Sequence, residues 1–324
     1  MPPLNIQQQF FEKLKSITPH EQLAVNVSEV LEISTSEAYK KISGKSLLNI
    51  RQIEQLCNKF KVSFEYNPMQ SSNKVLFSYS DLTSGKGDIE NYLDNLYNSL
   101  TYINSAPDCF ITCSTDDIPV FHLFQYPELS AFKLFFWKNR IQQRTKRTEL
   151  FSLNSINKKL VNKCFRLHNE YMKIPATEIW TKGSLLNTLY QIEYAIDARL
   201  IKDKSIILQL CDQLEFTIRE VAEYAMIEEK NNIDNKPIKF NWYFCENIGT
   251  TTYLANVSNG LVCYQRFNTF NNLQTDDKAY CVEINLWMQS LIKESICVSG
   301  QGEKQRNNYI EETIKNINQL KNHF

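Results

Sequence analysis

The chain has 324 residues, of which 43% are hydrophobic and 12% aromatic, and its 36 basic side chains balance 36 acidic ones. This length favours two domains, since one core rarely grows beyond roughly 250–300 residues, and the composition excludes a disordered or collagen-like protein. No apolar run approaches the roughly 20 residues of a membrane helix, and the N-terminus lacks a signal-peptide pattern. Nine cysteines without a C-x-x-C pair predict free thiols in a reducing compartment. We therefore expect a cytoplasmic protein without membrane contact, metal or cofactor.

Residues 1–67 are predicted to form a small all-α domain of four short helices. Apolar residues recur at helical spacing in four successive stretches, from residues 6–17 to residues 49–60. None of these stretches is long enough to be stable alone, so we expect them to share one core. The third stretch begins at a capping box, in which the Ser34 hydroxyl accepts a hydrogen bond from the Glu37 amide.

The third predicted helix, residues 35–43, has two different faces. A rotation of about 100° per residue gathers Ala38, Tyr39 and Ile42 on an apolar side. The same rotation gathers polar and cationic residues on the opposite side, namely Ser36, Glu37, Lys40 and Lys41. A helix that enters the major groove of DNA uses its N-terminal residues for base edges and nearby cations for phosphates. The pattern therefore favours a recognition helix, although a small bundle that only contacts protein is the alternative.

Residues 27–45 resemble the helix-turn-helix of λ-repressor-like (Cro/repressor, XRE-type) domains, and residues 53–64 resemble the closing helix of that family. The resemblance implies a DNA-binding domain in a bacterial-type transcriptional regulator. Ser28 occupies the place where a small residue packs between the two helices, whereas Glu32 replaces the usual turn glycine. The DNA-binding residues that the resemblance implies are Thr35, Ser36, Glu37, Lys40, Lys41 and Lys45, with Lys45 near a phosphate.

A polar join at residues 67–73 precedes a second domain, residues 74–324, whose pattern predicts an α+β fold. Two long apolar stripes, joined by a short polar turn near residue 203, predict an antiparallel helical hairpin over residues 184–228. Three strands are then expected in an antiparallel meander, with Asn259-Gly260 as a hairpin turn. The other expected elements are strands at 75–79, 110–113 and 296–298, and helices at 89–103, 121–172, 283–291 and 304–320. Strands at both ends, with helices between them, favour α+β over a repeating βαβ unit.

Charge is unevenly distributed in this second domain. Residues 69–130 hold 2 basic and 8 acidic side chains, whereas residues 131–173 hold 11 basic and 2 acidic ones. The basic segment either docks on the acidic segment of the same chain or contacts phosphate.

No catalytic motif is apparent in the sequence. The neighbouring residues Asp116 and Asp117 are expected on a solvated loop, and His122 is expected to be a packed side chain. The chain lacks the G-x-S-x-G, H-E-x-x-H and dinucleotide-binding signatures. We therefore expect no enzyme, although an enzyme tethered to DNA would be favoured if these three residues lined one cleft.

These observations predict a sequence-specific DNA-binding transcriptional regulator that binds double-stranded DNA through residues 35–43. One short recognition helix makes few base contacts, so we expect a homodimer that binds two half-sites. Exposed aromatic-rich helices at residues 121–137, or the 184–228 hairpin, are the two predicted dimer interfaces. The second domain is also expected to sense an effector, a small molecule or a protein. The alternative is a non-catalytic interaction adaptor whose N-terminal bundle does not bind DNA.

Overall fold

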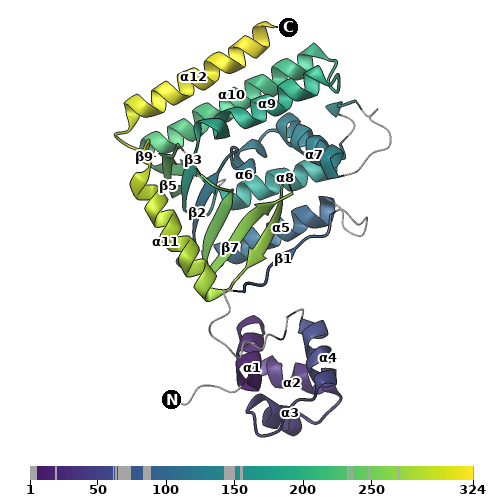
Figure 1. Cartoon of the computed structure of the whole chain (residues 1–324). Helices are drawn as coiled ribbons and strands as arrows, with labels where there is room; N and C mark the ends of the chain where they lie inside the picture. Colours follow the sequence, from purple (N-terminus) through teal and green to yellow (C-terminus); the bar gives the residue numbers. More distant parts are fainter. Residues whose placement is uncertain are drawn as a thin grey trace. The chain divides into compact units, whose positions relative to one another are not determined.

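A computed structural model gives the structure of the chain, which divides into two compact units, Met1–Lys74 and Val75–Phe324 (Figure 1). The structure describes residues 6–18, 20–60, 62, 64, 74–82, 89–141, 150–153, 156–231, 234, 236–246, 248–268 and 270–323. The predicted join at 67–73 lies outside these residues. In the part of the chain that the structure describes, no helix is long and apolar enough to cross a membrane.

The N-terminal unit is the predicted bundle of four helices. These are α1 (Ile6–Ile17), α2 (His20–Leu31), α3 (Thr35–Ile42) and α4 (Ile50–Phe60). Each helix contributes to one shared core, in which Phe11, Leu14, Val27, Ala38 and Leu56 are buried. Burial against neighbouring helices is what stabilises such short helices, because an isolated helix of 8–12 residues is marginal in water.

Local hydrogen bonds fix where α3 and α4 begin. The Ser34 hydroxyl accepts from the Glu37 amide at 3.2 Å, which is one of the two hydrogen bonds of the predicted capping box. At the start of α4, the Gln52 amide donates to the Asn49 side chain at 2.8 Å, and the Asn49 amide donates to the Gln52 side chain at 3.2 Å. This reciprocal pair is a capping box that closes the first turn of α4.

The larger unit is an α+β domain, as predicted, and its described residues form a nine-stranded mixed sheet. The strands are β1 (Ser78–Tyr79), β2 (Phe110–Thr115), β3 (Ala176–Trp180), β4 (Glu229–Asn231), β5 (Pro237–Phe244), β6 (Thr252–Val257), β7 (Gly260–Phe267), β8 (Asn271–Thr275) and β9 (Ile296–Cys297). The helices are α5 (Ile89–Asn104), α6 (Val120–Leu123), α7 (Pro127–Ile141), α8 (Lys158–Tyr171), α9 (Lys182–Asp197), α10 (Lys204–Ile227), α11 (Lys278–Glu294) and α12 (Glu303–Asn322).

The sheet has an antiparallel part and a parallel part. Strands β1, β8, β7, β6 and β2 follow one another in antiparallel pairs, and the predicted Asn259-Gly260 turn joins β6 to β7. Gly260 has a φ of +128°, which suits glycine. The first strand predicted for the meander, β5, instead pairs in parallel with β3, which pairs in parallel with β2. Helical crossovers α6–α8 and α9–α10 connect these strands, because parallel neighbours need a long connection.

Helices cover both faces of the sheet (Figure 1). The two faces of β6 show the layers, since Ala255 belongs to the main core with α5 and α8, whereas Leu254 packs against Cys281 and Met288 of α11. The predicted helical hairpin is α9 and α10, which packs with α12 next to β3 and β5.

Helix α7 is buried, which overturns one of the two predicted dimer interfaces. Phe132, Phe135 and Trp137 are at most 6% exposed, and the apolar residues from 121 to 137 belong to the main core. A helix that is apolar on all sides lies inside a protein. The expectation that residues 121–137 present exposed aromatic helices is therefore wrong.

The described part of the basic segment docks on the acidic segment of the same chain. The Lys159 ammonium lies 2.6 Å from the Glu90 carboxylate on α5, and Lys163 pairs with Glu90 at 3.2 Å and with Asp94. Arg166 lies over the Tyr97 ring at 4.4 Å. Of the two alternatives for the basic segment, these contacts favour docking within the chain for α8.

Candidate DNA-binding surface and a cavity in the larger domain

A sharp corner between α2 and α3 presents α3 to solvent. Glu32 has a φ of +53°, a left-handed conformation that glycine adopts more easily. The Ile33 amide donates to the Ser28 carbonyl at 3.0 Å and so closes the end of α2. Beyond this corner, the α3 outer face consists of five exposed residues, namely Thr35, Ser36, Glu37, Tyr39 and Lys40.

The predicted outward position of Lys41 is wrong. Lys41 is 6% exposed, and its ammonium donates to the Leu47 carbonyl at 2.9 Å in the segment after α3. The spacing of Ala38, Lys41 and Ile42 (i, i+3, i+4) places all three on the inner face. The aliphatic stem of Lys41 lies in the packed side while its charged end reaches a carbonyl. Tyr39, predicted on the apolar face, is instead 59% exposed.

Gln7 on α1 holds the segment that follows α3. Its side-chain nitrogen donates to the carbonyls of Lys41 at 2.7 Å and Ser46 at 2.8 Å. Its side-chain oxygen accepts from the Leu48 amide at 2.8 Å. Gln7 cannot be singled out from the sequence, because nothing in the run Gln7-Gln8-Gln9 marks the glutamine that faces inward.

The segment between α3 and α4 carries the remaining predicted DNA contact. Gly44 has a φ of +78° and ends α3 in a left-handed conformation. Lys45 follows it and is exposed, as is Leu47 at 75%. The cationic residues Lys40 and Lys45 are therefore available to solvent on and directly after α3, whereas Lys41 is not.

Residues 6–77 match the family model of the BetR domain. The BetR domain is a helix-turn-helix-like DNA-binding domain with four helices, and the match spans α1 to α4. The N-terminal unit therefore has a DNA-binding regulatory role. No curated protein and no solved structure matches the chain.

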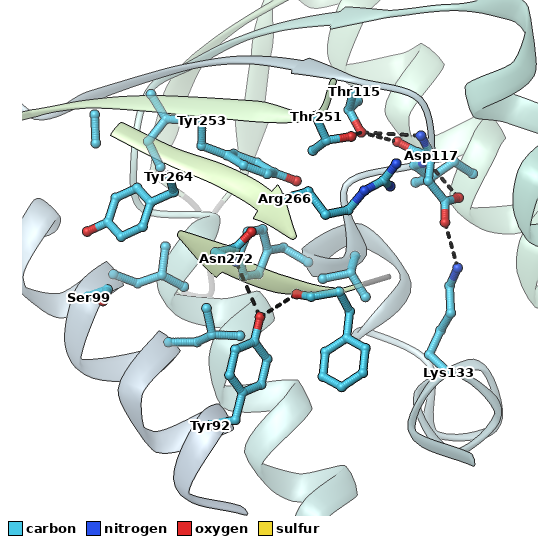
Figure 2. Close-up of a pocket in the computed structure, with 18 of the residues that line it drawn as sticks. Tyr92, Ser99, Thr115, Asp117, Lys133, Thr251, Tyr253, Tyr264, Arg266 and Asn272 are labelled. Carbon is cyan, nitrogen blue, oxygen red and sulfur yellow. Dashed lines mark hydrogen bonds and ion pairs between the residues drawn. The ribbon is translucent and has the colours of Figure 1, made fainter. Parts of the chain in front are cut away.

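A second candidate site is a cavity in the larger domain. It measures about 110 Å³ and lies between the sheet and helices α5 and α7 (Figure 2). Strands β2, β6, β7 and β8 supply the sheet side of its lining. Most of the lining is apolar, and six aromatic residues contribute to it, namely Tyr92, Phe121, Trp137, Tyr253, Tyr264 and Phe270. A mostly apolar cavity with a few polar groups is the usual form of a small-molecule site.

The polar end of the cavity is organised around the Asp117 carboxylate. One carboxylate oxygen accepts from the Ile118 amide and from the Thr188 hydroxyl, both at 2.9 Å. The other accepts from the Lys133 ammonium at 2.9 Å and from the Gln191 amide at 3.3 Å. Lys133 is 2% exposed and also donates to the Gln191 side chain at 3.0 Å. All four acceptor positions of this carboxylate are therefore used.

Asp116 points to a different set of partners. Its carboxylate accepts from the Thr251 hydroxyl at 2.7 Å and from the Arg266 guanidinium, which lines the cavity. Asp116 and Asp117 lie on a loop and point apart, as predicted, but the expectation that both are solvated is wrong for Asp117. The Asp117 side chain is 16% exposed and pairs with Lys133, whereas that of Asp116 is 42% exposed and pairs with Arg266. A single lysine inside the apolar run 132–137 was the signal in the sequence that a buried partner carboxylate exists.

His122 does not line the cavity and is a packed side chain, as expected. Its Nε2 lies 2.9 Å from the Glu178 carboxylate, which also accepts from the Tyr171 hydroxyl and from Trp180 Nε1 at 2.9 Å. Burial opposes ionisation of Glu178, but His122, Lys230 and Tyr171 outweigh it and lower the pKa of that carboxyl. Asp116, Asp117 and His122 thus do not line one cleft, so the arrangement that would favour an enzyme is not formed.

Proposed function

We propose that the chain is a sequence-specific transcriptional regulator that binds DNA in the λ-repressor-like (XRE-type) manner, with α3 in the major groove. The observation that carries this proposal is the α3 outer face, a polar surface exposed at a sharp helix corner within a BetR domain. A groove of about 12 Å admits one helix, and the first residues of that helix meet the base edges.

The exposed residues divide into two groups by chemistry. Thr35, Ser36 and Glu37 stand at the start of α3, where hydroxyl and carboxylate groups can meet base edges, a carboxylate accepting from a cytosine amino group. Lys40 and Lys45 supply cations for phosphates. Lys41 has no place among these DNA-facing residues, because its ammonium is held by the Leu47 carbonyl.

We also propose that the protein acts as a homodimer on two half-sites about 34 Å apart, or a multiple of that spacing, since one short helix makes few base contacts. The α9–α10 hairpin supports this proposal because it exposes large apolar side chains. Tyr190 and Phe216 are 54% and 55% exposed, and Met226 and Ile227 at the end of α10 are 54% and 52% exposed. The proposal assigns the larger domain no catalytic step.

The proposal is tested by selection from random duplexes, followed by affinity measurements at several salt concentrations. Wild type is compared with Lys40→Ala/Lys45→Ala, which removes two exposed cations from the proposed surface. Lys15→Ala is the matched control, because Lys15 lies on α1 and pairs with Glu12 at 2.6 Å. We expect wild type and the control to select the same two-fold symmetric sequence.

The double variant should bind that sequence more weakly. The slope of log K against log salt should become shallower by about 2, because each phosphate that a lysine no longer neutralises reduces it by about 0.9. Equal affinity and equal slope in all three proteins would refute the proposed surface. No selected sequence and no salt dependence in wild type would instead favour the interaction adaptor.

A further inference from the structure

We propose that the cavity in the larger domain binds a small molecule with an apolar body of about one ring and an oxygen acceptor, held at Arg266 and Tyr253. This proposal rests on the proposed function in one respect: it makes the bound molecule the effector of the regulator. Binding itself is measured without DNA, so the two proposals fail separately.

The size and lining of the cavity define the apolar body. An engineered cavity of about 150 Å³ lined by apolar side chains binds benzene, and this one measures about 110 Å³. Ring stacking fixes one wall of the cavity, because the Trp137 and Phe270 rings lie parallel with their centroids 4.3 Å apart. The Tyr92 hydroxyl donates to the Phe270 carbonyl at 2.6 Å and accepts from the Asn272 amide at 3.2 Å, which extends the same wall to α5 and β8 (Figure 2).

The free donors and acceptors at the polar end of the cavity define the head group of the ligand. Asp117 has no acceptor position left, because its four hydrogen bonds use them all. The Arg266 guanidinium carries five N–H donors, and within the described residues its hydrogen bonds go to Asp116 alone. The Tyr253 hydroxyl also lines the cavity, makes no hydrogen bond within the described residues, and points towards Arg266 (Figure 2). Arg266 and Tyr253 therefore hold donors that these hydrogen bonds do not use, so the ligand group that would pair with the two residues is an acceptor.

The charges at the polar end of the cavity further restrict which head groups the ligand can carry. The cations of Lys133 and Arg266 are already matched by the carboxylates of Asp117 and Asp116. An ammonium head would find no free carboxylate oxygen on Asp117 and would be repelled by both cations. A carbonyl or carboxylate oxygen can accept from the spare donors of Arg266 and Tyr253. An uncharged carbonyl also leaves the charge at this end balanced.

An open cleft adjoins the cavity. An open cleft of about 480 Å³ shares Asp117, Trp137 and Arg266 with the cavity and is bounded on its other side by Tyr190 and Gln191 of α9. The head-group site that we propose at Arg266 therefore lies beside an open cleft along α9.

The test uses the full-length chain and three probes that share one ring and differ in the head group. These are 4-fluorobenzamide, 4-fluorobenzoate and 4-fluorobenzylamine, followed by fluorine NMR. We expect saturable binding of the amide and the carboxylate in the millimolar range, as for other ligands of this size, and binding of the amine at least about tenfold weaker. Tighter binding of the amide probe than of the carboxylate probe would identify an uncharged ligand. Tighter binding of the carboxylate probe would identify an anionic ligand.

Tyr253→Phe removes only the hydroxyl and is expected to weaken amide binding about fivefold, the effect of one hydrogen bond. Tyr243→Phe, the same change on β5 outside the cavity lining, should leave binding unchanged. Arg266→Met should weaken both oxygen-bearing probes. The proposal is overturned if none of the probes binds the folded wild-type chain, or if all three bind equally and Tyr253→Phe has no effect.

Discussion

Gln7→Ala should destabilise the N-terminal domain far more than its place in a polar run suggests. The substitution removes three hydrogen bonds of 2.7–2.8 Å that join α1 to the segment after α3. At about 1 kcal/mol each, the loss is roughly 2–3 kcal/mol, because the Lys41 carbonyl keeps the Gly44 amide as a partner while the other two groups lose theirs. A domain of about 60 residues has a total stability of roughly 3–9 kcal/mol, so the loss is a large fraction.

Hydrogen exchange on the full-length chain measures this loss locally, because opening of α3 and α4 exposes their amides. We expect peptides from residues 35–60 to exchange about 30 to 150 times faster in the variant, the equivalent of 2–3 kcal/mol. Peptides from residues 89–323 should be unchanged. Gln9→Ala, at an exposed glutamine of the same helix, is the matched control. The reasoning is refuted if the two variants exchange alike.

Three further outcomes are expected. Lys41→Ala should destabilise the N-terminal domain in the same exchange assay, whereas Lys40→Ala should not, because only the first removes a buried side chain and its hydrogen bond to a carbonyl. Glu32→Gly should stabilise α2 and α3 by about 0.5–1 kcal/mol by relieving the positive φ, and Glu32→Ala should give no gain, since it keeps a Cβ. Burial lowers the pKa of His168 to about 4, from 6.5. The folded state therefore resists protonation of His168, so its stabilising contribution is complete above pH 6.5 and is lost as the pH falls towards 4. Between pH 7.5 and pH 5 the larger domain should lose about 2 kcal/mol by urea unfolding followed with tryptophan fluorescence. His168→Gln, which can still donate to the Phe121 carbonyl, should flatten that dependence, and an equally steep profile would show that other groups cause it.

The N-terminal domain could be predicted closely from its sequence because its signals are local. Helical spacing and the Ser34 cap involve residues only a few positions apart, and the structure contains both. The error at Lys41 and Tyr39 has a different cause. A helical wheel sorts residues by polarity, whereas Lys41 can bury its stem and satisfy its ammonium at Leu47, a partner that the wheel does not contain.

The larger domain was predicted less completely because its pairings are distant in sequence. Its fold class and its helical hairpin follow from periodicity. The short strand β3 was missed, and with it the parallel centre of the sheet, because five buried residues carry no alternating pattern. The polar end of the cavity was also missed, since Asp117 is 16 positions from Lys133 and 74 from Gln191. No local spacing reveals such pairs.

The hydrogen bonds to the Asp117 carboxylate restrict how the elements of the larger domain can move against one another. It joins the end of β2 to α7 through Lys133 and to α9 through Thr188 and Gln191. Sliding α7 against α9 would break a charge-assisted hydrogen bond between partly buried groups, at a cost of roughly 1.5–3 kcal/mol. One carboxylate therefore links the strand to both helices, and any shift of one of the three against the others has to break at least one of these hydrogen bonds.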